Sequence, residues 1–372
     1  MDSHNKNYNN MYVVAYISDL FCSNIYYNVY LKRLKGTIDN EILSEIILEF
    51  IQYYIERGGF SEFEFDNDVY VSSNILLLMD ITDAFTNSGK KDLITNVKKA
   101  LKSGYDKSKR NREYGGPLLA KDLLLTEMEI ENIKIDDKYT GNKNSNYSSD
   151  ICVMIMPVGL YYSNEDELEK LIDVSVSISK LTHNNVIGIL AGMTSAYFVS
   201  LAVREVDIIK WIFLLIKLLE SNLIKKHLNL DDTQNNIDYV SFLRHWQNYR
   251  DSKFNEGKIN KLKSDSSLAF KWKNYKKYKH HETLLFEDVI SCLIISYDSL
   301  LECDGKFEKI IYYALLLPGL TMAIGAFVGG LYGLVYGIDN VPKNMINYLE
   351  LNDILNKMEN LTKKFGESIH KI

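Results

Sequence analysis

Few residues in this chain have the types and spacings that enzyme chemistry requires. His183 could act as a general base, but no partner carboxylate or nucleophile is identifiable for it in the sequence, so helix capping is the favoured interpretation. His280-His281 is followed by Glu282, yet adjacent histidines point to different sides of a helix and no third ligand has the spacing of a zinc site. We therefore expect no metal ion at these histidines.

A basic segment, residues 258–281 (KINKLKSDSSLAFKWKNYKKYKHH), carries interleaved aromatic residues. Aromatic side chains can stack on bases while lysines follow phosphates, so the segment could bind nucleic acid, acidic lipid or an acidic protein. The alternative is a solvated helix or loop whose long lysine stems cover an apolar face. If a partner binds here, the expected interaction patch is Lys271, Trp272, Lys273, Lys276 and Lys277.

The composition is that of an ordinary globular protein. Of the 372 residues, 46% are hydrophobic and 25% are charged, and 43 Lys and Arg against 49 Asp and Glu give a net charge of −6. A nucleic-acid binder usually carries a basic field, so nucleic acid is not the expected partner. The four cysteines show no CxxC spacing and are predicted to be reduced, mostly buried thiols of a cytoplasmic protein. The polar start of the chain lacks the apolar stretch of a secretory signal.

The elements that would position a site are helices. Only four prolines occur, and apolar residues recur at helical spacing, as in 39–57, which Gly58-Gly59 is expected to end. No series of alternating strands is present. We predict an all-α fold in a single domain over residues 1–372, with surface loop or insert regions at 134–149 and 228–281.

Residues 310–338 contain no charged residue. Four glycines recur in this stretch at four-residue spacing: Gly325, Gly329, Gly333 and Gly337. Hydropathy alone would indicate a transmembrane helix with a dimerisation face. The competing interpretation is a buried core helix whose small residues allow close packing. Because Pro318-Gly319 interrupts the stretch and no basic cluster flanks it, we favour the core helix and expect no membrane partner.

Three segments together resemble motifs of the ADP-ribosylglycohydrolase family, especially its ADP-ribosylarginine hydrolase branch. They are residues 71–79 (VSSNILLLM), residues 181–188 (LTHNNVIG) with the small-residue helix that follows, and residues 318–337 (PGLTMAIGAFVGGLYGLVYG). The resemblance implies a compact orthogonal helical bundle with a cleft at helix N-termini. It also implies the family's chemistry, which is hydrolysis of an ADP-ribose linkage assisted by two magnesium ions.

The chain departs from the family at the carboxylates that would hold those ions. The family has Ser/Thr-Asp-Asp-Thr in the first motif and Asp-x-Asp-Ser/Thr in the last. The degenerate metal-site positions that the resemblance implies here are Ser72, Ser73, Asn74, Ile75, Leu320, Met322 and Ala323. At an effective dielectric of about 20, one carboxylate about 4 Å from a dication contributes roughly 8 kcal/mol before desolvation. The remaining hydroxyls, Ser72 and Thr321, cannot replace four such partners, so we expect no bound cofactor.

The positions that would hold the rest of the ligand also differ. Met154 stands where the family has an arginine, and 286–291 lacks the glycines of its nucleotide loop. Gly115-Gly116 remains where the family often has glycine, and with Met154 and His183 it completes the degenerate ligand-pocket positions. Asp231-Asp232-Thr233 spells the family's Asp-Asp-Thr, but it follows a helix late in the chain, so it is interpreted as an exposed acidic loop or N-cap.

The favoured hypothesis is a catalytically inactive pseudoenzyme that acts as a binding or scaffolding protein. Its helix-packing residues stay small while its site charges are lost. The alternative is a divergent hydrolase that removes ADP-ribose from modified arginine side chains with another acid–base pair, for which the candidates are Asp80, Asp83 and Asp150. The sequence does not name the partner, although an acidic protein would suit 258–281.

Overall fold

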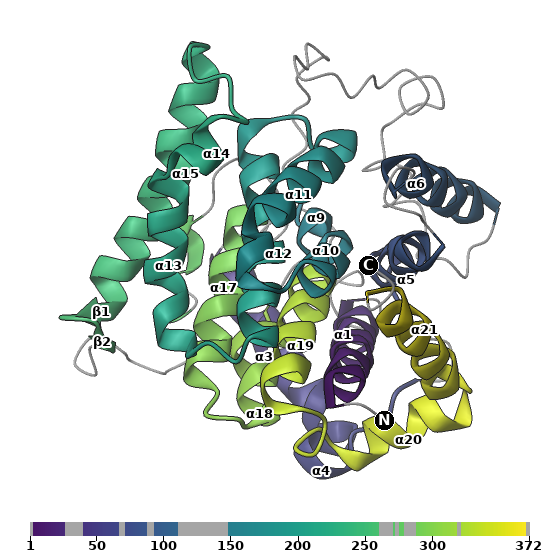
Figure 1. The fold of residues 1–372 in the computed structure, drawn as a ribbon. Helices are drawn as coiled ribbons and strands as arrows, with labels where there is room; N and C mark the ends of the chain where they lie inside the picture. The colour runs from purple at the N-terminus through teal and green to yellow at the C-terminus, as the bar shows by residue number, and fades with distance from the viewer. Residues whose placement is uncertain are drawn as a thin grey trace.

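The computed structural model describes residues 3–26, 40–66, 71–87, 93–110, 148–259, 271, 275–278, 288–317 and 321–369. Nearly all elements in these ranges are helical (Figure 1): α1 (Ser3–Ile25), α3 (Asn40–Glu56), α4 (Gly59–Glu62), α5 (Ser73–Thr86), α6 (Leu93–Arg110), α9 (Asp150–Met154), α10 (Met156–Tyr161), η2 (Glu165–Glu167), α11 (Leu168–Thr182), α12 (Val186–Val203), α13 (Ile208–Glu220), α14 (Asn222–Lys225), α15 (Thr233–Lys253), η3 (Lys276–Tyr278), α17 (Val289–Glu302), α18 (Phe307–Ile310), the π-helical turn η4 (Ile311–Leu315), α19 (Met322–Tyr336), α20 (Lys343–Leu351) and α21 (Ile354–Ile369). Within the described ranges, β1 (Phe254–Asn255) and β2 (Lys258–Ile259) form the one sheet, an antiparallel pair. The predicted all-α fold is confirmed.

Local signals set several helix boundaries. The apolar spacing over 39–57 becomes α3, which ends at Glu56. Gly58 follows with a φ of +102°, in the left-handed region that favours glycine. A Cβ at this position would lie 2.3 Å from the carbonyl oxygen of Glu62. The predicted glycine stop is therefore confirmed.

The centre of the fold is α12, which is apolar on all sides. It packs against α9, α10, α11, α13, α15, α17 and α19. In the described part of the chain it is the one helix whose length and hydropathy would allow it to cross a bilayer, and 94% of it is buried inside the fold. A helix covered on every face by protein has the pattern of a core element.

Close contact between α1 and α19 explains the glycine spacing. The two helices run antiparallel and side by side (Figure 1). A Cβ at Gly329 would lie 2.4 Å from Ser18 Oγ, and one at Gly333 would lie 2.3 Å from the Asn10 carbonyl oxygen. The glycines thus let two backbones approach inside the fold, as the core-helix interpretation predicts. The uncharged stretch is also divided, because η4 precedes α19 and α19 is only 15 residues long.

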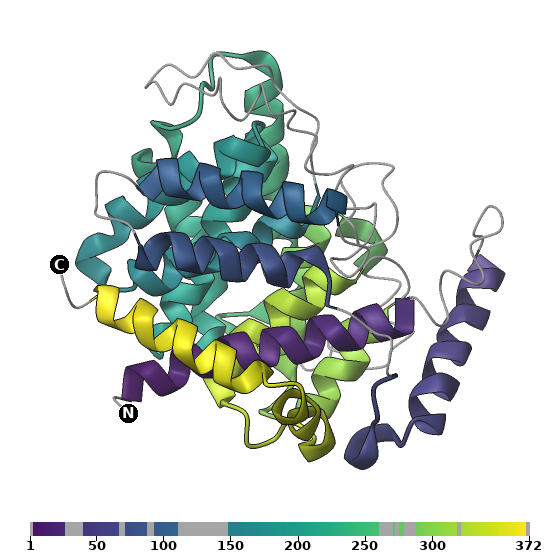
Figure 2. The same ribbon diagram turned by 90° about the vertical axis from the view of Figure 1, so that its right-hand side faces the viewer.

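A further layer of helices covers one side of α1. Figure 2 shows α6, α5 and α21 lying side by side, with α1 next to α21, and each neighbouring pair is in contact. Aromatic side chains join these helices: Phe365 of α21 packs edge-on against Tyr8 of α1 and against Phe85 of α5. Through α21, this packing joins the C-terminal end of α5 to the first half of α1.

Residues 228–281, predicted as a surface loop or insert region, are not a loop over 233–259. Residues 233–253 form α15, a six-turn helix, and the β1–β2 hairpin follows directly. Its polar composition reflects a helix with one solvated face, since Phe242 and Trp246 on the other face are fully buried. Of the predicted loop at 134–149, residues 134–147 lie outside the described residues.

Candidate functional site

The starts of α5 and α19 meet at one turn of α1, and Asp19 forms the first contact. Ser72, the N-cap of α5, donates its backbone N–H to Asp19 Oδ2 at 2.6 Å and its hydroxyl to Asp19 Oδ1. The same hydroxyl oxygen accepts the backbone N–H of Asn74 at 3.2 Å, as an N-cap does. A buried carboxylate on α1 therefore fixes the position of the α5 N-terminus.

Cys22 forms the second contact, one turn further along α1. Its thiol donates to the carbonyl oxygen of Leu315 at 3.9 Å. Its sulfur also lies 2.7 Å from the position that a Cβ would take at Gly325, in the first turn of α19. Asp19 and Cys22 are three residues apart, so they lie on the same face of α1. The two helix starts that the resemblance marks as metal-site motifs therefore converge on this face. These are two of the helix N-termini at which the resemblance implies a cleft.

Burial dominates the electrostatics of this convergence. Asp19 is fully buried, and desolvation raises its pKa to about 7 although the two hydrogen bonds from Ser72 act to lower it. Burial also raises the pKa of the Cys22 thiol. Near neutral pH the carboxyl of Asp19 is thus about half protonated and both of its oxygens are engaged by Ser72.

The predicted degenerate positions supply hydroxyl, amide and apolar side chains. All those described are at most 9% exposed: Ser72, Ser73, Asn74, Ile75, Met322 and Ala323. Leu320 lies outside the described residues. No group of three or more His, Cys, Asp or Glu that could hold a metal ion is found within the described ranges.

His183 has a partner that the sequence did not reveal. Its Nε2 lies 3.2 Å from Asp150 Oδ1 and 3.1 Å from the carbonyl oxygen of Ser148, and its Nδ1 lies 2.8 Å from Thr182 Oγ1. Burial acts to raise the pKa of Asp150, but His183 and the hydrogen bonds from Ser148 and the Ile151 N–H together lower it below its ordinary value. His183 also caps a helix, as predicted: it is the C-cap residue of α11, and its backbone N–H donates to the carbonyl oxygen of Ser179 at 2.7 Å. The start of α12 is capped by Asn185, whose side chain accepts the N–H of Gly188 at 2.8 Å.

The remaining ligand-pocket positions are internal or undescribed. Met154 is fully buried, and Thr182 Oγ1 lies 3.7 Å from its sulfur. Gly115 and Gly116 lie outside the described residues, as do His280, His281 and Glu282. Met154 and His183 therefore belong to one packed region, in which residues of α9 contact Thr182 and His183 at the end of α11 and both helices pack against α12.

Lys271 does not belong to a surface patch. It is 3% exposed, and its Nζ lies 2.5 Å from Asp298 Oδ2 and 2.6 Å from Glu302 Oε2 of α17. Lys253 Nζ lies 2.7 Å from the other oxygen of Asp298. Burial acts to lower the pKa of Lys271, but the surrounding acidic groups, Tyr275 among them, raise it overall. A lysine so placed cannot reach a partner, so its assignment to the interaction patch is wrong.

The rest of that predicted patch is only partly described. Lys277 is exposed, and Lys276 opens the short helix η3. Trp272 and Lys273 lie outside the described residues. Two lysines of this basic segment therefore differ in environment: Lys271 is buried and structural, whereas Lys277 is exposed.

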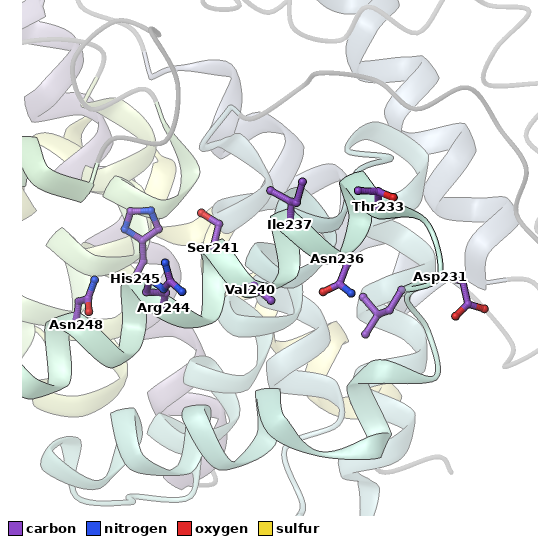
Figure 3. Close-up of a pocket in the computed structure, with 10 residues that line it drawn as sticks. Asp231, Thr233, Asn236, Ile237, Val240, Ser241, Arg244, His245 and Asn248 are labelled. Carbon is purple, nitrogen blue, oxygen red and sulfur yellow. The ribbon is translucent and has the colours of Figure 1, made fainter.

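Asp231-Asp232-Thr233 lies at the start of α15, as the N-cap interpretation predicts. Asp232 accepts the backbone N–H of Asn235 at 3.0 Å, and Asp231 is exposed. Figure 3 shows the face of α15 that follows, where Arg244 and His245 border a groove of about 540 Å³. This acidic triplet is remote from the convergence of α5 and α19 on α1, and it serves to begin a helix.

Comparisons with known proteins agree with this fold. The family model described as ADP-ribosylglycohydrolase matches residues 50–370. A protein of Acanthamoeba polyphaga mimivirus whose name assigns it to the ADP-ribosyl glycohydrolases is 22% identical over 352 residues, which is 90% of this chain and 66% of that protein. The ADP-ribosylhydrolase ARH1 of Dictyostelium discoideum is 25% identical over 232 residues, which is 57% of this chain and 58% of that protein. This chain belongs to the ADP-ribosylglycohydrolase family.

A solved structure shares the architecture. It is titled an ADP-ribosylglycohydrolase-related protein complex, and it matches 99% of this chain with a TM-score of 0.56 at 13% identity. A sequence identity this low supports a shared fold but not a shared activity. The family and its fold are thereby established, and the activity of this member is a separate question.

Proposed function

We propose that this chain is a catalytically inactive, ADP-ribosylglycohydrolase-like pseudoenzyme that acts as a binding or scaffolding protein in the cytoplasm. The observation that supports this proposal is the chemistry at the convergence of α5 and α19. Hydroxyl, amide and apolar side chains occupy the positions where the family's reaction requires carboxylates. The glycines that pack α19 against α1 are kept, so the fold persists without the charges.

The donor set does not fit a pair of magnesium ions. Mg²⁺ prefers several carboxylate and water oxygens in octahedral geometry, and two such ions repel each other. Asp19 contacts this convergence, but one carboxylate that already accepts two hydrogen bonds from Ser72 cannot hold two Mg²⁺ ions. The side chains at this convergence therefore do not support a metal-assisted reaction.

The alternative, a divergent hydrolase, has little support from the positions of its candidate residues. Asp80 and Asp83 lie seven and ten residues after the first residue of α5, about 10 and 15 Å along the helix axis from its N-terminus. Asp150 is held by His183, which is fully buried. Asp80 and Asp83 are thus displaced from the α5 N-terminus, where the family's chemistry would take place, and Asp150 is engaged by a histidine.

A hydrolysis assay tests the loss of activity. The full chain is incubated with Mg²⁺ and a protein carrying ADP-ribose on arginine, beside the Dictyostelium ADP-ribosylhydrolase as a positive control. We expect no release of ADP-ribose above the buffer background. Metal-dependent release that is abolished by Asp150→Asn would instead support the divergent hydrolase.

A partner capture experiment tests the scaffolding role. An acidic partner at 258–281 would contact Lys276 and Lys277, since Lys271 is internal. The double variant Lys276→Glu/Lys277→Glu should then lose a partner that the wild type retains, whereas Lys363→Glu/Lys364→Glu, a matched exposed pair on α21, should keep it. Equal capture by all three proteins would reject this surface as the binding site.

A further inference from the structure

A second cavity lies at the opposite end of α1 and α19 from the site described above. Its volume is about 610 Å³, and it is bordered by the C-terminal ends of α12 and α19 and by the first turns of α1. Because α19 is 15 residues long, this cavity is about 20 Å from Thr321. It is therefore separate from the convergence of α5 and α19.

The described lining of this cavity is anionic. Three carboxylates border it, from Glu205, Asp207 and Asp339, and no lysine or arginine is among the described lining residues. Asp207 Oδ1 accepts the backbone N–H of Ile209, whereas Glu205 and Asp339 are exposed. The C-terminal ends of two helices add partial negative charge from their last carbonyl groups. The cavity is thus suited to a positively charged ligand.

A buried amide inside the cavity gives an independent indication of a ligand. Asn10 is 5% exposed and lines the cavity, and its side chain has no hydrogen-bond partner among the described residues. Its Nδ2 lies beside Gly337, 3.4 Å from the position that a Cβ there would take. Its polar atoms are not sealed in the interior but open to the cavity, where water or a ligand can bond to them. A ligand that donates an N–H group would satisfy its carbonyl oxygen.

We propose that this cavity binds an organic cationic group, an alkylammonium or a guanidinium. Glu205 and Asp339 supply the charge, and the amide of Asn10 accepts a hydrogen bond. The carboxylates are too dispersed for a metal ion, since no metal-binding group of three is found in the described part of the chain. The cationic group could come from a free amine or from a basic side chain of a partner protein.

Two probes distinguish these sources by isothermal titration of the full chain at low salt. Agmatine carries a guanidinium and an ammonium as a small molecule, and acetyl-Gly-Arg-Gly-amide presents a guanidinium on a peptide. Saturable binding of agmatine alone supports a free amine, and binding of the peptide supports a partner's side chain. The absence of binding by both probes at millimolar concentration overturns the proposal.

Matched variants locate the binding. Glu205→Gln/Asp339→Asn should weaken binding by roughly threefold to tenfold, because each exposed ion pair contributes modestly. Glu350→Gln/Glu367→Gln removes the same charge from exposed positions on α20 and α21 and should bind like the wild type. The proposal is overturned if Glu205→Gln/Asp339→Asn binds with the affinity of the wild type. It is also overturned if the two double variants lose the same amount of affinity.

Glu205→Gly separates lost binding from lost folding. Glu205 has a φ of +55° after α12, at the position of a helix C-terminus where glycine is usual. Glycine relieves the backbone there, so this variant should melt at a higher temperature than the wild type while binding the probe more weakly. A more stable variant with unchanged affinity shows that Glu205 does not hold the cation, and it overturns the proposal.

Discussion

At the scale of single residues, burial decides what the chemically capable groups of this chain do. Asp19, His183 and Lys271 each have a type that could serve catalysis or binding. Each is buried and held by a partner from a distant segment: Ser72, Asp150 and Asp298, respectively. Their polar groups connect elements of the fold, and this leaves little charge available to a substrate.

Asp19 makes a testable contribution to the pH dependence of stability. Its pKa is about 7 in the folded chain against an ordinary value of 3.8. The folded state therefore holds a proton that the unfolded state releases, and the free energy of unfolding falls as pH rises from about 4 to about 7, by up to about 4 kcal/mol. Asp19→Asn, which stays neutral, should lose this slope.

Urea unfolding at about pH 5 and about pH 8 measures this effect. The stability of Asp19→Asn relative to the wild type should rise between the two conditions. A constant difference between the two proteins would show that Asp19 is ionised in the folded chain throughout this range, with its pKa near the ordinary value.

Lys271 gives a second prediction at this scale. Lys271→Met would leave Asp298 and Glu302 with Lys253 as their remaining ion-pair partner among the described residues, and should destabilise the chain by about 3 kcal/mol. Lys277→Met removes an exposed lysine a few residues away and should change the stability by less than about 0.5 kcal/mol. Equal effects in a denaturant titration would mean that Lys271 is solvated like Lys277.

At the scale of elements, the contact of α1 with α19 is the feature most sensitive to side-chain size. Gly329→Ala would place a Cβ 2.4 Å from Ser18 Oγ and 2.6 Å from the Val14 carbonyl oxygen. Alanine in place of glycine ordinarily stabilises a helix by about 1 kcal/mol, but here we expect a loss of about 2 kcal/mol from overpacking. Thermal unfolding measures the sign, and Ser18→Gly in the same chain should recover part of the loss. A stabilised Gly329→Ala protein would show that the two helices are further apart.

The sequence predicted elements better than contacts. Helical spacing and a glycine stop were sufficient for α3, and the glycine spacing indicated the close packing of α19. The four cysteines are free and buried, as their spacing predicted. His183 and Asp150 are 33 positions apart, and Lys271 and Asp298 are 27 apart, so no local pattern joins them. The contact of Asp19 with Ser72 was not predicted, because Asp19 lies within an apolar helix and 53 positions from Ser72. A lone carboxylate in such a helix nevertheless indicates a buried partner.

At the scale of the whole molecule, the single-domain interpretation predicts one cooperative unfolding transition. Two of the three tryptophans, Trp211 of α13 and Trp246 of α15, are fully buried beside Phe198 of the central helix. In the variant Trp272→Phe, tryptophan fluorescence reports on that half of the bundle. Far-UV circular dichroism reports on all helices. The two transitions should coincide in urea, whereas a fluorescence midpoint displaced from the dichroism midpoint would indicate two units.

The central claim is that the convergence of α5 and α19 cannot hold two divalent ions. It is tested most directly by isothermal titration of the full chain with Mg²⁺ in the presence and absence of ADP-ribose, beside the Dictyostelium ADP-ribosylhydrolase in the same buffer. We predict no saturable heat of magnesium binding for this chain in either condition. Saturable binding of two Mg²⁺ ions per chain, strengthened by ADP-ribose, would contradict the account.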